Sequence, residues 1–252
     1  MPTLEICCYD IESAITAQDG GADRIELCSG RYDGGVTPSY GALIKAHKFI
    51  SVPVHPIVRP RGGDFYYSQS EIATMKSDIS LIKELGFKGI VLGALETDGS
   101  IDILIMRKLL ALTSDLSVTF HRAFDMCRDP FTALKQLADL GIDRILTSGQ
   151  QSTAEQGLPL IIELNEKTTG PRIMAGCGIN SNNIKTFLDA GIKDIHSSAG
   201  KYQPSYMQYH NPNVSMSQNT QQNEYLNYQV DPDIVVAMKE QIRYTNNTLF
   251  IG

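Results

Sequence analysis

The sequence predicts an α/β fold in which eight parallel strands, each followed by a helix, close into a single-domain barrel. Two observations support this prediction. Short β-branched runs alternate with longer amphipathic runs along most of the 252 residues, and glycines follow the helical runs. The repeat is roughly 25 residues long, which is the length of one strand-helix unit in a (β/α)₈ TIM barrel. A doubly wound open sheet is the alternative, but it would need fewer strands.

The strand candidates are short apolar runs bounded by polar or glycine residues. In chain order they occupy residues 4–8, 23–28, 53–59, 89–93, 117–121, 143–147, 172–176 and 193–197.

The helical candidates lie between these strands and space their apolar residues three or four apart, as Ile79, Ile82 and Leu85 do. A glycine at the end of a helix permits the left-handed turn that sends the chain back to the sheet. Such glycines follow three of the runs, at Gly86, Gly141 and Gly191. The helical runs cover residues 11–20, 38–49, 69–85, 101–112, 130–140, 153–168 and 181–190.

The strand and helix alternation ends near Gly200. Residues 201–229 are rich in Tyr, Asn, Gln and Ser, and we expect them to form an irregular, extended loop. Residues 230–243 then predict the closing eighth helix, with Asp231 as its N-cap and Pro232 at its first position. The whole chain, 1–252, is expected to be one domain.

Composition and charge exclude several function classes. The formal net charge of −6 and the lack of Lys and Arg clusters argue against nucleic-acid binding. The amino-terminal segment lacks a basic region followed by an apolar run, and no stretch approaches a membrane span, so we expect a cytoplasmic protein. The five cysteines are expected to be free thiols, and their spacing has no CxxC or Cys/His pattern of a structural zinc site.

Reactive side chains and glycines collect where the predicted strands end. Because the carboxyl ends of parallel strands lie on one face of a barrel, these residues are expected to build one shared site. The six segments that end this way are residues 25–30, 57–65, 119–125, 145–149, 173–179 and 195–200.

The first two strands share a Glu-x-Cys pattern. Alternation along a strand places Glu5 with Cys7, and Glu26 with Cys28, on one face each. If both faces point into the barrel, the two carboxylates form one layer and the two thiols form the layer above. Neighbouring strands are about 4.8 Å apart, so the sulfurs can share a metal ion, and two soft sulfur ligands suit Cu(I). The alternative is that both cysteines are small core residues.

Carboxylates inside a barrel need cationic or hydrogen-bonding partners. We expect Arg59 and Arg61, at the end of the third strand, to pair with Glu5 and Glu26 in the site. Arg24 is placed by its sequence position at the opposite end of the barrel. A buried ion-pair network without a catalytic role is the alternative.

Histidines end the fifth and the eighth strand. His121 is followed by Arg122 and Asp125, and His196 lies on the last strand. Imidazoles with carboxylates nearby are suited to general acid-base catalysis near neutral pH. Histidines that merely fill the core are the alternative.

Glycine and serine follow the last three strands, where barrels of this type often bind phosphate through backbone N–H groups. The candidate residues for an anion or phosphate are Ser148, Gly149, Gly176, Gly178, Ser197 and Ser198.

Several motifs resemble those of the CutC family of copper homeostasis proteins. They are GGADRIELCSG at 20–30, GGVTPSYG at 34–41, RPRGGDFYYS at 59–68, TFHRAFDM at 119–126 and LTSG at 146–149. The resemblance covers residues 4–200. It implies a cytosolic TIM barrel that is often oligomeric, and we expect a homodimer. It also implies Cu(I) binding, with the family's strand-borne cysteines corresponding to Cys7 and Cys28. No organic cofactor is evident from the sequence.

Copper binding leaves the arginines, histidines and glycine loops unexplained. A second hypothesis is therefore a lyase or isomerase acting on a small phosphorylated or carboxylated metabolite. In that case Glu5, Glu26 and His121 transfer protons, while Arg59 and Arg61 hold the anion.

Overall fold

The computed structural model describes residues 1–216 and 223–248, and within them it contains the eight barrel strands that the sequence predicts. They are β1 (Thr3–Cys8), β2 (Arg24–Leu27), β3 (Val54–Pro56), β4 (Gly89–Leu92), β5 (Ser117–Phe120), β6 (Arg144–Thr147), β7 (Arg172–Ala175) and β8 (Asp194–Ser197).

These strands form a closed barrel. Their order is β3-β2-β1-β8-β7-β6-β5-β4, and neighbouring strands are parallel. A parallel bridge between Ile57 and Val91, with a 2.7 Å hydrogen bond from Val58 N to Val91 O, joins the β3 side to β4. Parallel strands that close in this order form a TIM barrel, so the predicted fold class is confirmed.

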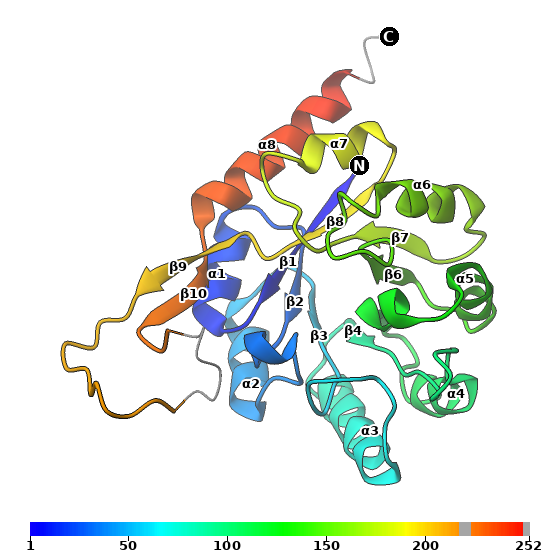
Figure 1. Cartoon of the computed structure of the whole chain (residues 1–252), viewed down its shortest axis with the longest axis horizontal. Coiled ribbons are helices and arrows are strands. Elements are labelled where there is room, and N and C mark those ends of the chain that lie inside the picture. Colours follow the sequence, from blue (N-terminus) through cyan, green and yellow to red (C-terminus); the bar gives the residue numbers. More distant parts are fainter. Residues whose placement is uncertain (217–222, 249–252) are drawn as a thin grey trace.

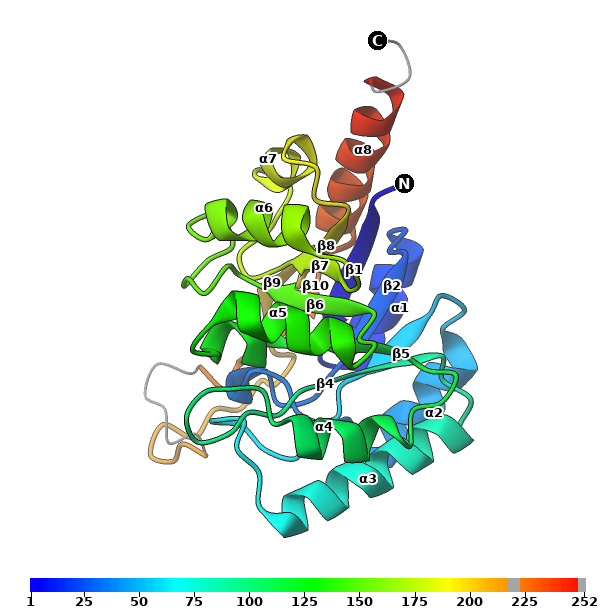
Figure 2. The ribbon, with the colours of Figure 1, turned by 90° about the vertical axis from the view of Figure 1, so that its right-hand side faces the viewer.

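Helices surround the barrel on its outside (Figures 1 and 2). Those between the strands are α1 (Ile11–Asp19), α2 (Tyr40–Phe49), α3 (Gln69–Glu84), α4 (Ile103–Leu110), α5 (Pro130–Asp139), α6 (Leu158–Lys167) and α7 (Ile184–Asp189). The closing helix α8 (Pro232–Thr248) begins after Asp231, whose Oδ1 accepts a 2.9 Å hydrogen bond from Asp233 N. Two 3₁₀ turns, η1 (Arg31–Asp33) and η2 (Arg122–Met126), follow β2 and β5.

The main hydrophobic core lies between the strands and the helices. Fully buried residues such as Leu4, Ile6 and Leu27 point outward from β1 and β2 into it, and Cys8 joins them. The alternate residues of the same strands point into the barrel, where the side chains are largely polar. The barrel interior therefore differs from the usual packing of branched apolar residues.

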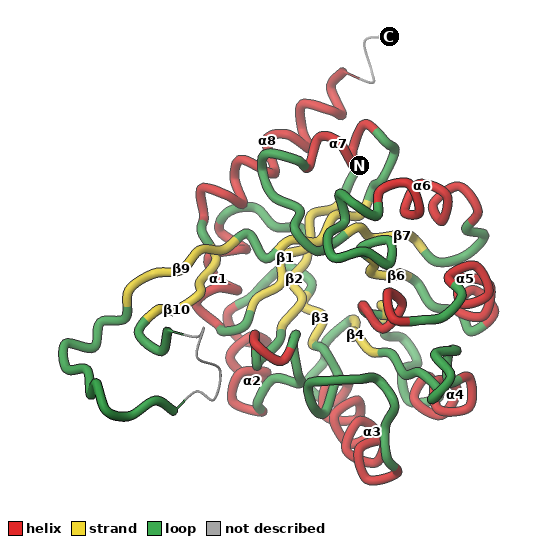
Figure 3. Tube along the Cα trace, in the orientation of Figure 1, coloured by secondary structure: helices red, strands yellow, loops and turns green. Residues whose placement is uncertain are grey.

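The segment expected to be an irregular loop contains regular structure at both ends. β9 (Gly200–Pro204) and β10 (Leu226–Val230) pair as an antiparallel ribbon that projects from the barrel (Figure 3). The Arg31 guanidinium lies 3.7 Å from the ring centroid of Tyr228 and donates a 2.8 Å hydrogen bond to Tyr202 Oη. Alternation in a short polar ribbon gives a weak sequence signal, so these strands were not predicted. Residues 217–222 of this segment lie outside the described residues.

Among the described residues, no helix is both long enough and apolar enough to span a bilayer.

Candidate functional site

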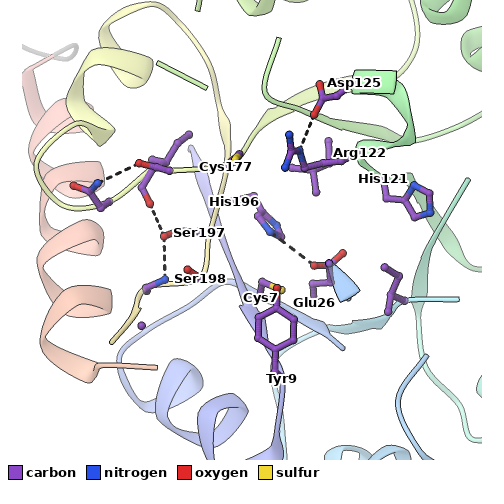
Figure 4. Close-up of a pocket in the computed structure, with 18 of the residues that line it drawn as sticks. Cys7, Tyr9, Glu26, His121, Arg122, Asp125, Cys177, His196, Ser197 and Ser198 are labelled. Atoms are coloured by element: carbon purple, nitrogen blue, oxygen red, sulfur yellow. Dashed lines mark hydrogen bonds and ion pairs between the residues drawn. The ribbon is translucent and has the colours of Figure 1, made fainter. Parts of the chain in front are cut away.

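A cavity of about 600 Å³ opens at the carboxyl ends of the strands. It collects side chains from strands that are far apart in the sequence (Figure 4). The predicted site residues that line it are Cys7, Glu26, Arg59, His121, Arg122, Asp125, Gly178, His196, Ser197 and Ser198. Residues expected to gather at the carboxyl ends of the strands therefore line one cavity.

The two thiols of the Glu-x-Cys pattern lie together inside the barrel. Cys7 Sγ and Cys28 Sγ are 3.8 Å apart, and both side chains are buried against Ile57 and Val91. Neither cysteine takes part in a disulfide bond. The pair is therefore a reduced dithiol that packs against Ile57 and Val91 on one side, with Cys7 facing the cavity.

The strand register differs from the layers expected from the sequence. Cys7 is level with Glu26 on β2, whereas Glu5 is level with Arg24. This offset of two residues arises because the strands of a barrel are staggered and tilted. It places a thiol beside a carboxylate in one layer and a carboxylate beside a guanidinium in the layer below.

Glu5 is fully buried and is held by Arg24 and His196. Arg24 Nε donates to Glu5 Oε2, and His196 Nδ1 lies 2.8 Å from Glu5 Oε1. Arg24 also approaches Asp194, with Nη2 3.5 Å from Oδ1. The arginine that sequence position assigned to the far end of the barrel is thus the main partner of the carboxylate.

Three ligand-type atoms converge above this layer. Cys7, Glu26 and His196 each offer one such atom, and these atoms lie within 4.8 Å of one another. His196 Nε2 lies 3.8 Å from Glu26 Oε2, which is too long for a hydrogen bond (Figure 4). Thiolate, imidazole and carboxylate at this spacing can coordinate a metal ion.

The ionisable side chains of this cluster shift one another's pKa values. Burial alone would raise the pKa of Glu5, but Arg24 and His196 outweigh it and hold that pKa well below its ordinary value. The hydrogen bond with Cys28 and the proximity of His196 lower the pKa of Cys7 despite its burial. Burial and the Cys7 sulfur raise the pKa of Glu26.

For His196, the neighbouring groups change the pKa more than burial does. Burial would lower its pKa, but hydrogen bonds with Cys7 and Glu5 raise it well above the ordinary value.

His121 is the second cavity histidine, and its environment is different. Its ring packs 4.9 Å from that of Phe65, and its Nδ1 accepts a 3.2 Å hydrogen bond from Ala123 N. Burial, aided by the positive charge of Arg59, lowers the pKa of His121 to about 3. His121 is thus a neutral imidazole at physiological pH.

The two arginines after β3 do not pair with the barrel carboxylates. Arg59 donates to the carbonyl oxygens of Asp33, Gly35 and Gly63 at 2.6 to 2.8 Å. Arg61 pairs with Asp64 at 2.9 Å and with Glu71 at 2.5 Å. Both arginines shape the loop after β3, and Arg24 takes the role expected of them.

Arg122 and Asp125 form a second polar group on the cavity wall. Arg122 Nε donates a 2.7 Å hydrogen bond to Asp125 Oδ2, and its Nη2 donates to Ser148 Oγ at 3.0 Å. Asp125 also accepts from Ser148 N at 2.9 Å, so it anchors the loop after β6. The Arg122 side chain is 42% exposed and borders the cavity as a cation.

The glycines and serines predicted to bind an anion have different roles in the structure. Gly149 (φ +68°) packs so closely that an added Cβ would lie 2.2 Å from Gly157 O. A Cβ at Gly176 would lie 2.6 Å from Leu146 Cδ1 and 3.1 Å from His196 Cβ, so this glycine makes room for both side chains. Ser197 Oγ donates to Ile179 O at 2.6 Å, and Ser198 Oγ lies 2.7 Å from Tyr228 Oη. Gly178, Ser197 and Ser198 lie on the cavity wall.

Tyr9 is a site residue that the sequence analysis did not single out. It borders the cavity beside Cys7 and packs against the dithiol cluster. The nearby Cys7 sulfur, together with burial, raises the pKa of the Tyr9 phenol. Alternation along β1 puts Tyr9 on the same face as Glu5 and Cys7, and that signal could have identified it.

Comparisons with known proteins agree on one family. A family model described as "CutC family" matches residues 2–201. A protein of Proteus mirabilis (strain HI4320) named "family protein CutC" is 55% identical over 240 residues, which are 95% of this chain and 96% of that protein. A protein of the same name from Salmonella agona (strain SL483) is 54% identical over 239 residues, with the same coverage of both chains.

Solved structures agree with the sequence matches. The structure titled "Putative Copper Homeostasis Protein CutC" from Streptococcus agalactiae superimposes with a TM-score of 0.75 at 31% identity, covering 79% of this chain and 99% of that one. Thiamine phosphate pyrophosphorylase from Pyrococcus furiosus is similar in fold alone, with a TM-score of 0.58, 12% identity and 96% of each chain covered.

Proposed function

The chain belongs to the CutC family, and from this membership we propose that it acts in copper homeostasis by binding Cu(I) through Cys7 and Cys28. The observation that carries the proposal is the buried pair of reduced thiols, 3.8 Å apart, at the base of an open cavity. Two soft sulfur ligands favour a soft monovalent ion. The proposal includes a cytosolic location, where thiols stay reduced.

A homodimer is part of the same proposal. Large apolar or aromatic side chains are exposed on the arm between β9 and β10, where a second copy could cover them. They include Tyr206, Met207, Tyr209 and Met216.

The first experiment replaces both thiols, as Cys7→Ser/Cys28→Ser, and measures Cu(I) binding by competition with a chromogenic chelator. The wild-type chain is expected to withdraw one Cu(I) per chain, and the double variant is expected to withdraw none, because serine hydroxyls are poor ligands for a soft ion. The control is Cys8→Ala/Cys127→Ala, which removes two buried thiols that lie outside the cluster. Stoichiometric binding by the serine variant would refute the proposal.

The cavity itself favours a second candidate function, a lyase or isomerase for a small phosphorylated or carboxylated metabolite. Two thiols need no cavity of about 600 Å³, and the half-exposed Arg122 on its wall suits an anion. In this candidate Arg122 replaces Arg61 as the anion-binding cation, while Glu26 and His196 exchange protons with the substrate. Ser197 and Ser198 would help to bind the anionic group.

This candidate is tested by a thermal-shift screen of phosphorylated and carboxylated metabolites. At least one compound is expected to raise the Tm of the wild-type chain, because a ligand that binds only the folded state stabilises it. The shift should vanish in Arg122→Gln and persist in Arg107→Gln, which changes an exposed arginine on α4. A shift that survives Arg122→Gln, or a screen in which no compound acts, would count against this function.

A further inference from the structure

We propose that Cys7, Cys28, His196 and Glu26 form a four-donor site for a divalent cation of the zinc class. The inference rests on the proposed function in one respect, since it also uses Cys7 and Cys28 as metal ligands. It differs in the donor set and in the ion, because two sulfurs, one nitrogen and one oxygen form a set of intermediate softness that suits Zn²⁺.

The sulfur separation fits a four-coordinate ion. Two Zn–S bonds of about 2.3 Å at a tetrahedral angle set the sulfurs about 3.8 Å apart, whereas a linear arrangement of equal bonds sets them about 4.6 Å apart. The observed separation of Cys7 Sγ and Cys28 Sγ is 3.8 Å. Packed thiols reach this separation as well, so the other two donors decide the argument.

His196 on β8 and Glu26 on β2 lie close to Cys7, and Cys28 joins the group through its 3.8 Å contact with Cys7 Sγ. The ligand atoms of Cys7, Glu26 and His196 lie within 4.8 Å of one another. The gap of 3.8 Å between His196 Nε2 and Glu26 Oε2 is too wide for a hydrogen bond and leaves both atoms facing a common point near Cys7 (Figure 4). An ion at that point would bridge the two groups.

His196 is also oriented as metal-binding histidines are. Its Nδ1 lies 2.8 Å from Glu5 Oε1, so a neutral His196 would carry its proton on Nδ1, and its Nε2 would then be available to coordinate an ion. Histidine ligands usually donate their other N–H to a carboxylate in this way. Arg24 in turn fixes Glu5, which is fully buried. The carboxylate-histidine pair is therefore present before any ion binds.

The surroundings suit a bound ion that exchanges with solution. Ile57 and Val91 pack against the thiols and exclude water from one side. Cys7, Glu26 and His196 border the open cavity on the other side, which provides an entry path. Loading with a divalent cation requires Cys7 and Cys28 to be ionised, so it releases protons.

The test compares Zn²⁺ and Cu(I) binding to the full chain and its variants. Wild-type protein is expected to bind one Zn²⁺, with X-ray absorption reporting two sulfur ligands at about 2.3 Å and two nitrogen or oxygen ligands at about 2.0 to 2.2 Å. His196→Asn is expected to weaken Zn²⁺ binding at least 100-fold, and Glu5→Gln about 10- to 100-fold. Cu(I) affinity should change less than about threefold in both, since only sulfur is needed.

The controls separate this inference from the copper proposal. Cys8→Ala removes a thiol that points to the outer core and should bind both ions as the wild-type chain does. Circular dichroism checks that each variant is folded. Zn²⁺ held by oxygen and nitrogen alone, or equal Zn²⁺ affinity in His196→Asn, would overturn the four-donor site while leaving the Cu(I) proposal intact. Retention of Cu(I) by Cys7→Ser/Cys28→Ser would refute the copper proposal instead.

Discussion

Replacing Arg24 by methionine is expected to destabilise the protein by about 3 to 5 kcal/mol, because it leaves a buried carboxylate without its cation. Arg24 Nε donates to Glu5, and Arg24 Nη2 lies 3.5 Å from Asp194 Oδ1. The exposed fractions of the three side chains are 8%, 0% and 1%. Methionine matches the length of the arginine stem but supplies neither charge nor donors. Urea unfolding at pH 7 measures the loss.

The matched control is Arg172→Met. Arg172 Nε also pairs with Asp194, at 2.6 Å, but its side chain is 52% exposed. Water can replace much of that interaction, so this variant is expected to lose about 1 kcal/mol or less. Equal losses in Arg24→Met and Arg172→Met would show that the burial of Glu5 is not what makes Arg24 important.

A double variant tests whether the loss of stability in Arg24→Met comes from the unpaired charge of Glu5. Glu5→Gln removes the charge that Arg24 compensates, so Glu5→Gln/Arg24→Met is expected to be more stable than Arg24→Met alone. Without that recovery, the loss would have to be attributed to the contacts of the arginine stem or to Asp194.

The second large effect is a pH-dependent loss of stability that depends on His121. Its pKa in the folded protein is lowered to about 3 by burial and by Arg59, while an unfolded histidine titrates near 6.5. Between these values the unfolded chain binds more protons than the folded one. Stability therefore falls as the pH falls through this window, by up to about 1.4 kcal/mol per pH unit, and His121 contributes no pH dependence above it.

The test variant is His121→Asn, whose side-chain oxygen can accept the hydrogen bond that Ala123 N donates to His121 Nδ1. Between pH 6.5 and 4.5 the wild-type protein is expected to lose about 2 to 3 kcal/mol more than this variant, as measured by urea unfolding. His47→Asn, which removes a solvent-exposed histidine on α2, is expected to follow the wild-type curve. Parallel curves for wild type and His121→Asn would contradict the buried, neutral state of His121.

The barrel could be predicted because its determinants are local. Apolar periodicity and helix-ending glycines such as Gly86 act within a few residues, and each barrel strand lies where the pattern placed it. The ribbon of β9 and β10 could not be predicted in this way. It is held by cross-strand pairing and by contacts of Arg31 with Tyr202 and Tyr228, and a local sequence pattern does not indicate such contacts.

The sequence predicted which residues gather at the mouth of the barrel, but not which of them contact one another. Strand ends identified Cys7, Cys28, Glu26 and His196, because alternation and strand direction fix which residues point into the mouth of a parallel barrel. Arg24 lies at the amino-terminal end of β2, as its sequence position indicated, but its pairing with Glu5 was not expected, because the stagger between strands decides which residues are level with one another. Sequence spacing likewise did not indicate that Cys7, Glu26 and His196 lie together, since metal-binding motifs describe residues close together in the chain.

The sequence by itself determined the parallel barrel, the family and the face on which the reactive residues gather, since these follow from periodicity and motifs within short segments. Only the tertiary structure decided which residues meet. The register of β1 against β2 and β8 sets Cys7 level with Glu26 and Glu5 level with both Arg24 and His196. That register is a property of barrel closure, in which strand number, tilt and stagger are fixed together.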